Sequence, residues 1–386
     1  MVTGIVCEYN PFHKGHLYQI EKAKSMGADK IVCVMSGNFV QRGECAFFDK
    51  HIRAKAAVMS GADVVIDLPT PWAMASAETF ARGSIGLLQS FGIDALSFGC
   101  ENDDEILLRA CADKLKDEQT GLLIKKYTAD GLSYPETVSK AITESLGDKA
   151  GQILSSPNNT LAIEYIRQLS DNIRLLPVKR QGASHDSDTA KGGIASASMI
   201  RKLKLNDDSL SFVPADLVPL YKEADNYDIS HCERAVLSAL RLMSKDEFSL
   251  FVSDTNGLDM RIYDSLQKAD SLESLYAMAK SKNYTHSRVR REVLNLWLKI
   301  KRYYSEGIPP YIKILAVSEK GLSLLSSAKN NSALPIITKH SEAKKLTGKA
   351  LEIYEAECRN TDLFSLCCEK IKECSLEKKH SMMIVR

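Results

Sequence analysis

The sequence predicts an α/β fold, in which a parallel, Rossmann-like sheet is followed by a mostly α-helical C-terminal domain. In the first half, short apolar runs alternate with helical patterns. Each run is apolar throughout, which is typical of parallel strands covered by helices on both faces. Beyond about residue 205 the pattern changes mainly to helices. A chain of 386 residues is long enough for two domains, and we expect them to span 1–205 and 206–386.

The composition is that of an ordinary globular protein, with 44% hydrophobic and 26% charged residues. The net charge is only +2, so a nucleic-acid site would have to come from local clustering of basic residues. No apolar run approaches the ~18–20 residues of a membrane span, and the N-terminus shows no signal-peptide pattern. We therefore expect no membrane partner and a cytoplasmic location. The ten cysteines lack zinc-site spacing, which predicts no metal and suits a reducing compartment.

Five strands are expected in the first half. The first, at residues 4–7, is followed by Asn10-Pro11, which ends it because proline lacks an N–H and disfavours helix before it. The other strands are expected at residues 30–35, 62–69, 95–99 and 173–178. Helices fill the intervals, with Asp49 as a helix cap, one long helix at 73–89, and a charged helical insertion at about 104–147.

The turn after the first strand reads His13-Lys14-Gly15-His16 and leads directly into a helical pattern. Unpaired backbone N–H groups and the positive end of the helix make such a turn an anion site. Two imidazoles at this position favour a nucleotide phosphate, and Lys14 is either a further phosphate contact or a solvated side chain. The alternative interpretation is that both histidines only cap the helix. In this context the His-x-Gly-His pattern resembles the signature of the nucleotidyltransferase superfamily.

Ligands of parallel sheets bind at the carboxyl ends of the strands, so we expect the loops at 9–16, 36–43 and 99–102 to converge. Gly99 would permit close approach of a nucleotide, and Arg180 follows the fifth strand at the same edge. Asn158 and Asn159 are expected first as helix caps and second as adenosine or ribose contacts.

A second candidate phosphate site is the run Ser196-Ala-Ser-Met-Ile-Arg201. Ser198 and Arg201 at a helix start would supply a hydroxyl and a guanidinium to a polyphosphate. The alternative is a serine cap with a surface arginine. Arg42 and Glu44 either line an acceptor pocket or pair on the surface.

In the second half, helices are expected at 215–224, 232–243, 271–280 and 286–304. One face of the last helix carries the basic residues Arg288, Arg291, Lys299 and Arg302. Such a stripe suits a nucleic-acid backbone, although a solvated helix face has the same pattern. Two short strands at 310–317 and 334–338 follow, and the basic tail from residue 369 is expected to lack fixed structure.

Several stretches, in the same order along most of the chain, resemble one bacterial family, the tRNA(Met) cytidine acetate ligases. They are EYNPFHKGH, SGNFVQRGE, ADVVIDLP, SPNNTLAIEY, VKRQGASH, SASMIRKL, YTHSRVRRE, YIKILAVSEKG and LPIITK. The resemblance implies an enzyme that forms acetyl-adenylate from ATP and acetate. It would then acetylate N4 of the wobble cytidine of elongator tRNA(Met).

The resemblance and the motifs together assign site residues. Catalysis would use His13, Lys14, His16 and Arg201. ATP would be bound by Val6, Cys7, Glu8, Tyr9, Asn10, Pro11, Phe12, His13, Lys14, Gly15, His16, Leu17, Tyr18, Gln19, Gly99, Asn158 or Asn159, Arg180, Ser198 and Arg201. ATP is the implied cofactor, and Mg²⁺ is compatible with it. Two alternatives stay open: an adenylyltransferase that joins AMP to a small phosphorylated acceptor, and a non-catalytic nucleotide-sensing or RNA-binding protein.

Overall fold

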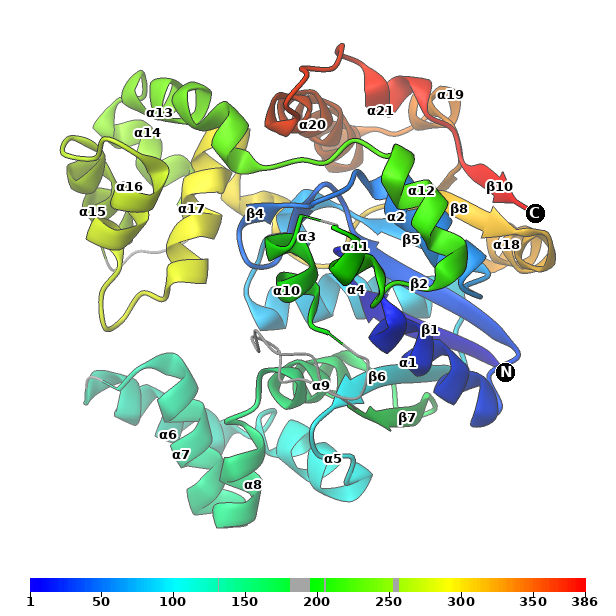
Figure 1. The fold of residues 1–386 in the computed structure, drawn as a ribbon. Helices are drawn as coiled ribbons and strands as arrows, with labels where there is room; N and C mark the ends of the chain where they lie inside the picture. The colour runs from blue at the N-terminus through cyan, green and yellow to red at the C-terminus, as the bar shows by residue number, and fades with distance from the viewer. Residues whose placement is uncertain (131, 181–194, 205, 253–256) are drawn as a thin grey trace.

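The structure is a computed structural model that describes all residues except 131, 181–194, 205 and 253–256. Within the described ranges, eight strands form the main sheet: β1 Val2–Cys7, β2 Lys30–Ser36, β5 Val64–Leu68, β6 Ala95–Cys100, β7 Arg174–Lys179, β8 Ile312–Ser318, β9 Ile336–Ile337 and β10 Met383–Val385. Their order is β10-β8-β5-β2-β1-β6-β7, with β9 beside β8 (Figure 1). A separate hairpin is formed by β3 Phe39–Val40 and β4 Glu44–Cys45.

The five strands predicted in the first half are confirmed, and all of them run parallel. Ile5 of β1 lies between Cys33 of β2 and Ser97 of β6. The chain therefore builds the sheet outward from β1, first through β2 and β5 and then, on the other side, through β6 and β7. Such a change of direction opens a crevice at the carboxyl ends of the central strands.

The helices of the first half are α1 Lys14–Ser25, α2 Lys50–Met59, α3 Thr70–Ala73, α4 Ala77–Phe91, α5 Glu105–Lys114, α6 Glu118–Ala129, α7 Tyr134–Leu146, α8 Asp148–Ile153 and α9 Pro157–Gln168. The Asp49 cap is confirmed, because its carboxylate accepts hydrogen bonds from the backbone of His51 and Ile52. The long helix expected at 73–89 is confirmed as α4, although it begins at Ala77 and ends at Phe91. The chain breaks after α3, and Ser76 starts α4 by accepting a hydrogen bond from Thr79 N.

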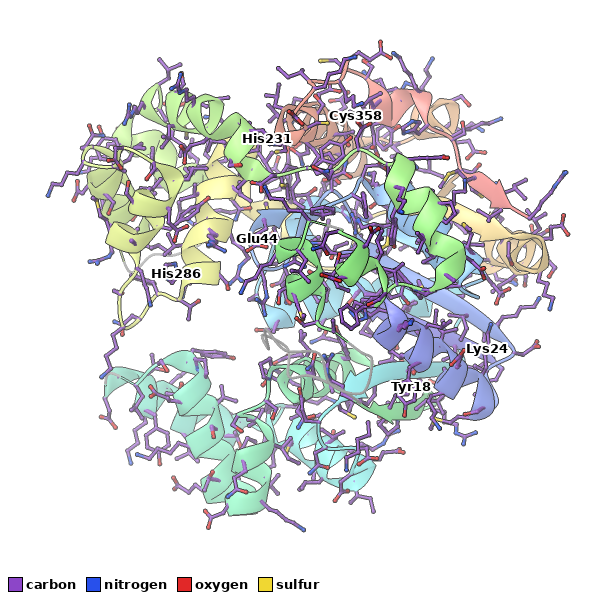
Figure 2. The ribbon with its side chains drawn as sticks, in the orientation of Figure 1. Tyr18, Lys24, Glu44, His231, His286 and Cys358 are labelled. Atoms are coloured by element: carbon purple, nitrogen blue, oxygen red, sulfur yellow. The ribbon has the colours of Figure 1, made fainter. Side chains whose placement is uncertain are left out.

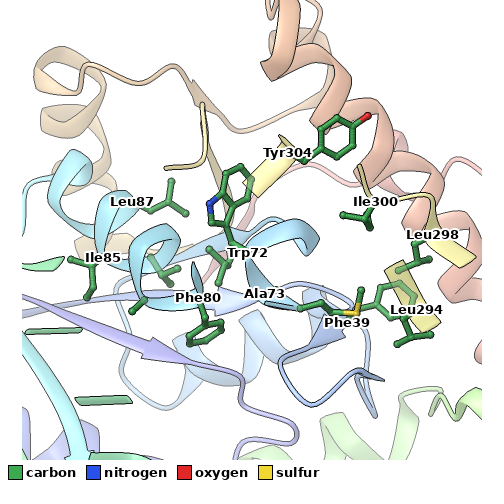
Figure 3. Packing of buried hydrophobic residues seen from close by; sticks show 14 of the residues in the cluster. Phe39, Trp72, Ala73, Phe80, Ile85, Leu87, Leu294, Leu298, Ile300 and Tyr304 are labelled. Carbon is green, nitrogen blue, oxygen red and sulfur yellow. The ribbon is translucent and has the colours of Figure 1, made fainter. Parts of the chain in front are cut away.

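The corner between α3 and α4 is built around Trp72, which is fully buried (Figure 3). Gly83 of α4 lies directly against the indole, and a Cβ at this position would collide with Trp72 Cδ1. The indole Nε1 donates to the carbonyl of Gly307, 2.9 Å away. Figure 3 shows that Ile300 and Tyr304 belong to the same buried hydrophobic cluster as Trp72. Residues from the second half of the chain therefore complete the core of the first half.

The remaining helical elements are α10 Ala197–Lys202, α11 Asp207–Leu210, η1 Ala215–Leu217, α12 Val218–Glu223, η2 Ile229–Cys232, α13 Glu233–Arg241, α14 Lys245–Phe251, α15 Leu258–Leu266, α16 Leu272–Ala279, α17 His286–Leu298, η3 Arg302–Ser305, α18 Glu319–Asn331, α19 His340–Ala343, α20 Gly348–Phe364, η4 Ser365–Cys367 and α21 Leu376–Lys379. Helices α13 to α17 form a group beside the sheet (Figure 1). None of the helices within the described ranges is long and apolar enough to cross a membrane.

After this helical group the chain returns to the main sheet. Strand β8 pairs antiparallel with β5, and β10 pairs with β8. The division expected between residues 205 and 206 therefore does not coincide with the edge of the sheet. Strand β5 needs this partner, because an unpaired edge would leave its backbone hydrogen-bonding groups open to other chains.

The tail from residue 369, expected to lack fixed structure, is ordered instead. Glu377 of α21 is buried, and its carboxylate accepts hydrogen bonds from Lys50 Nζ at 2.8 Å and from Lys313 Nζ. Lys50 Nζ also lies 2.5 Å from Asp67 Oδ2. Burial alone would raise the pKa of Glu377, but Lys313 and Lys50 hold it below its usual range. Removing one member would leave a buried charge unpaired, so this cluster fixes the tail against the sheet.

Candidate functional site

A cavity of about 210 Å³ lies at the carboxyl ends of β1 and β6, where the predicted loops converge. It is lined by Val6, Cys7, Glu8, Tyr9, Asn10, His13, His16, Gln19, Val40, Gln41, Arg42, Glu44, Phe80, Phe98, Gly99, Asn158, Leu161, Tyr165, Arg180, Ser196, Ala197, Ser198 and Arg201. A second pocket of about 60 Å³ shares His13, His16, Gln19, Gly99, Arg180 and Ser196 with it and adds Gly15, Tyr18, Val178 and Ala195. Most of the predicted nucleotide residues therefore surround one space.

His13 and His16 cap helix α1 and line the cavity at the same time. His13 Nδ1 accepts a hydrogen bond from Gly15 N at 3.0 Å, and His16 Nδ1 accepts one from His13 N at 3.3 Å. The two rings stack with 3.8 Å between their centroids. Because each Nδ1 is an acceptor, a neutral ring carries its proton on Nε2 and can donate from there. The capping interpretation and the phosphate interpretation are therefore compatible, since capping fixes the tautomer.

The turn is held in place by the segment after α10. Phe12 N donates to the Tyr221 hydroxyl at 3.1 Å, and Lys14 N donates to the carbonyl of Phe212 at 2.9 Å. Phe12 is fully buried, and the Lys14 side chain is exposed. In the part of the chain that the structure describes, the predicted nucleotide residues that line neither pocket are Pro11, Phe12, Lys14, Leu17 and Asn159.

The second motif lies beside the first. Ser196 Oγ caps α10 by accepting a hydrogen bond from Met199 N, and it lies 3.1 Å from Ser198 Oγ. Arg201 Nη1 donates to the carbonyl of Asn10 at 2.7 Å. Ser196 is therefore a helix cap, as the alternative interpretation predicted. Arg201, which that interpretation placed on the surface, lines the cavity instead.

The two asparagines of helix α9 have different positions. Asn159 is buried, and its Oδ1 accepts hydrogen bonds from the backbone of Glu101 and Asn102, which fixes the loop after β6. Asn158 lines the cavity and donates from Nδ2 to Glu101 Oε1 at 2.5 Å. The sequence left open whether Asn158 or Asn159 contacts the nucleotide; of the two, Asn158 is the residue that lines the cavity.

At the far edge, Arg180 N donates to the carbonyl of Cys100 at 2.9 Å, and both Arg180 and Gly99 line the cavity. After Arg180 the chain continues into residues 181–194, which lie outside the described residues.

Sequence reasoning missed the apolar wall of the cavity, formed by Phe80, Phe98, Leu161 and Tyr165. A usable signal was present on α9, because Asn158, Leu161 and Tyr165 are spaced by three and four residues and so share one helix face. Burial raises the pKa of the Tyr165 hydroxyl, which therefore stays protonated. These four side chains give the cavity an apolar lining in addition to its polar turn.

The basic stripe expected on one helix is not formed as predicted. Helix α17 ends at Leu298, because Lys299 adopts a left-handed conformation with φ 55°, and Arg302 lies in the separate turn η3. Arg291 points toward the site, where its Nη1 donates to the carbonyl of Gln41 at 3.2 Å. Arg288 lies with its guanidinium carbon 5.3 Å from the ring centroid of Tyr284. The helix predicted to run to residue 304 is therefore wrong in length.

The chain was compared with known proteins. The HIGH Nucleotidyl Transferase family model matches residues 1–379. The tRNA(Met) cytidine acetate ligase of Acetivibrio thermocellus is 35% identical over 400 residues, covering 95% of each chain. The enzyme of the same name from Syntrophomonas wolfei is 36% identical, covering 95% of this chain and 94% of that one.

The crystal structure of Thermotoga maritima TmcAL bound with alpha-thio ATP superimposes with a TM-score of 0.92 at 28% identity, covering 100% of this chain and 99% of that one. The apo crystal structure of the same protein matches with the same TM-score at 27% identity. The resemblance seen in the sequence is thereby confirmed across the whole chain. The chain belongs to the tRNA(Met) cytidine acetate ligase family of HIGH nucleotidyl transferases.

Proposed function

We propose that this protein activates acetate with ATP and transfers the acetyl group to N4 of the wobble cytidine of elongator tRNA(Met). The names of the relatives and the nucleotide analogue bound by the Thermotoga maritima protein support this function. The observation that carries it in this chain is the meeting of two motifs in one cavity. The stacked pair His13 and His16 lies beside Arg201, which is hydrogen-bonded to Asn10 of the same turn.

In the first step, an oxygen of acetate attacks the α-phosphorus of ATP, and the bond from that phosphorus to pyrophosphate breaks. No general base is needed, because acetate is already ionised at neutral pH. Catalysis then consists of positioning and charge stabilisation. The Nε2–H groups of His13 and His16 would donate to the α-phosphate, and Ser198 and Arg201 would hold the departing pyrophosphate. Mg²⁺ would accompany the nucleotide.

In the second step, the cytidine amine attacks the acetyl carbon, the bond from that carbon to the AMP oxygen breaks, and the proton released from the amine passes to solvent. The base has to leave its stack to reach the mixed anhydride. Arg288, Lys299 and Arg302 would bind the tRNA backbone from the side of α17 and η3. An adenylyltransferase with a small acceptor would use the same nucleotide motifs, but the family match runs through the helical group as well.

The test is incubation of the protein with ATP, labelled acetate and total tRNA, followed by nucleoside analysis. The expected result is label in N4-acetylcytidine from elongator tRNA(Met), together with acetate-dependent exchange of pyrophosphate into ATP. A stable dinucleotide product without labelled tRNA would support the adenylyltransferase instead. Absence of pyrophosphate exchange with acetate, alone or with tRNA, would contradict the ligase function.

A further inference from the structure

A single carboxylate joins the nucleotide cavity to helix α17. Glu44 Oε1 lies 2.7 Å from Arg290 Nη1, and Glu44 Oε2 lies 3.7 Å from Arg201 Nη2. Glu44 is on β4 and lines the cavity, whereas Arg290 belongs to α17 and does not. Figure 2 labels Glu44 in the region between α10 and α17. Each carboxylate oxygen therefore faces an arginine from a different part of the chain.

The loop that carries Glu44 is seated directly on α17. Gly43 has φ 74°, and a Cβ at this position would lie 2.5 Å from Arg291 N and 2.7 Å from the Arg290 carbonyl carbon. Arg291 also donates to the carbonyl of Gln41. No side chain fits between loop and helix, so the position of the loop depends on the position of α17.

Arg290 is itself held on the helical group. Its guanidinium carbon lies 5.4 Å from the ring centroid of Tyr276, and its Nη2 lies 3.5 Å from Glu273 Oε2. The other terminal guanidinium nitrogen of Arg201, Nη1, donates to the carbonyl of Asn10. Arg201 is thus held at two points, one on the first motif and one on Glu44.

We propose that Glu44 is a positioning residue for the adenylation step. It holds Arg201 in the orientation that grips the polyphosphate and, through Arg290, makes this orientation depend on helix α17. The inference rests on the proposed function, because it assumes that Arg201 contacts ATP. Beyond the proposed function, Arg290, which lies outside the cavity, is inferred to affect the KM for ATP.

The test uses Glu44→Gln, Arg290→Gln and the matched control Glu273→Gln in acetate-dependent pyrophosphate exchange without tRNA. Glu273 is the other carboxylate on Arg290, but its side chain is 72% exposed, so this ion pair contributes little to the position of Arg290, and Glu273 does not line the cavity. We expect Glu44→Gln and Arg290→Gln to raise the KM for ATP about tenfold, with kcat within about twofold of wild type, and Glu273→Gln to change neither. Thermal melting of each variant reports any loss of folded protein.

A double variant tests whether Glu44 acts through Arg201. In an Arg201→Ala background, Glu44→Gln is expected to cause no further loss, because the group that it positions is gone. Additive losses would overturn the inference, and so would an unchanged or lowered KM in Glu44→Gln, since a lowered value means that Glu44 competes with the phosphates for Arg201. If Arg201→Ala itself leaves exchange unchanged, the proposed role of Arg201 fails first. The two failures are therefore distinguishable.

Discussion

The imidazoles of His13 and His16 lie ring on ring, 3.8 Å apart, and each is fixed by a backbone N–H bound to its Nδ1. The bonds that start helix α1 thus also set which nitrogen of each ring can donate. A residue that preserves the cap without an Nε2 donor should separate the two roles. Asparagine at position 13 meets this condition, because it is a good N-cap residue.

The first prediction concerns these rings. His13→Asn is expected to lower acetate-dependent pyrophosphate exchange by about 10²–10³-fold, the usual cost of one lost transition-state donor. Its stability should stay near wild type, whereas His13→Ala should lose about 1 kcal/mol more through the missing cap. His16→Ala is expected to abolish exchange while the protein stays folded. Exchange assays and urea unfolding measure these effects, and near-normal exchange in His13→Asn would refute the donor role.

The second prediction compares neighbouring asparagines. Asn159→Ala should destabilise the protein by about 1–3 kcal/mol, because the N–H groups of Glu101 and Asn102 lose their acceptor. Asn158→Ala should change stability by no more than about 0.5 kcal/mol but raise the KM for ATP severalfold. Unfolding curves and exchange kinetics on both variants check this. Equal stability losses in the two variants would contradict the assignment.

The third prediction concerns tRNA. Reversing the charges of Arg288, Lys299 and Arg302 is expected to weaken tRNA binding and to reduce the salt slope by about 1 for each lost phosphate contact. Pyrophosphate exchange should persist in this variant. Arg291→Gln is expected to impair exchange instead, because Arg291 supports the Gln41 carbonyl at the cavity. Filter binding at several salt concentrations, combined with exchange assays, separates the two classes. Loss of exchange in the triple variant would assign those residues to the fold.

The fourth prediction concerns the pH dependence of stability. The pKa of Glu357 is raised from its ordinary value of 4.5 to about 7, because burial, with help from Asp67 and Glu377, outweighs the opposing effect of Lys50. The folded state therefore holds this proton more tightly than the unfolded chain. The stabilisation is full below pH 4.5 and is lost as the pH rises through about 7.

Glu357→Gln mimics the protonated acid and can keep its hydrogen bonds to Thr70. Relative to wild type, its free energy of unfolding should rise by on the order of 1–3 kcal/mol between pH 5 and pH 8. Urea unfolding at the two pH values measures the change. A difference between variant and wild type that does not vary with pH would show that Glu357 is ionised in the folded protein.

The sequence allowed the parallel strands and the nucleotide turn to be predicted because their signals are local. Apolar runs report buried strands, and His13 and His16 are three residues apart on a strand–turn–helix unit. Arg201 could be joined to that unit only through a resemblance, since no local rule brings it to the carbonyl of Asn10.

Other features depend on contacts between distant residues and could not be predicted. The tail reads as basic and polar, yet Glu377 meets Lys50 inside the protein. Arg291 has the helical spacing of a surface residue. However, the loop at Gly43 packs directly against this part of α17, and Arg291 donates a hydrogen bond to Gln41 at the cavity. The end of α17 depends on the left-handed backbone at Lys299, a conformation that lysine rarely adopts.

The pairing of β5 with β8 has a consequence for biosynthesis. A ribosome releases the residues of β5 long before those of β8, so the nascent chain carries an open sheet edge until β8 has been made. Lys50 is likewise without Glu377 until the ribosome has added 327 further residues. A truncated product that stops near residue 205 would keep the nucleotide motifs, but the edge of β5 would stay unpaired and could pair with other chains. Such a product would be a poor choice for expressing the catalytic half alone.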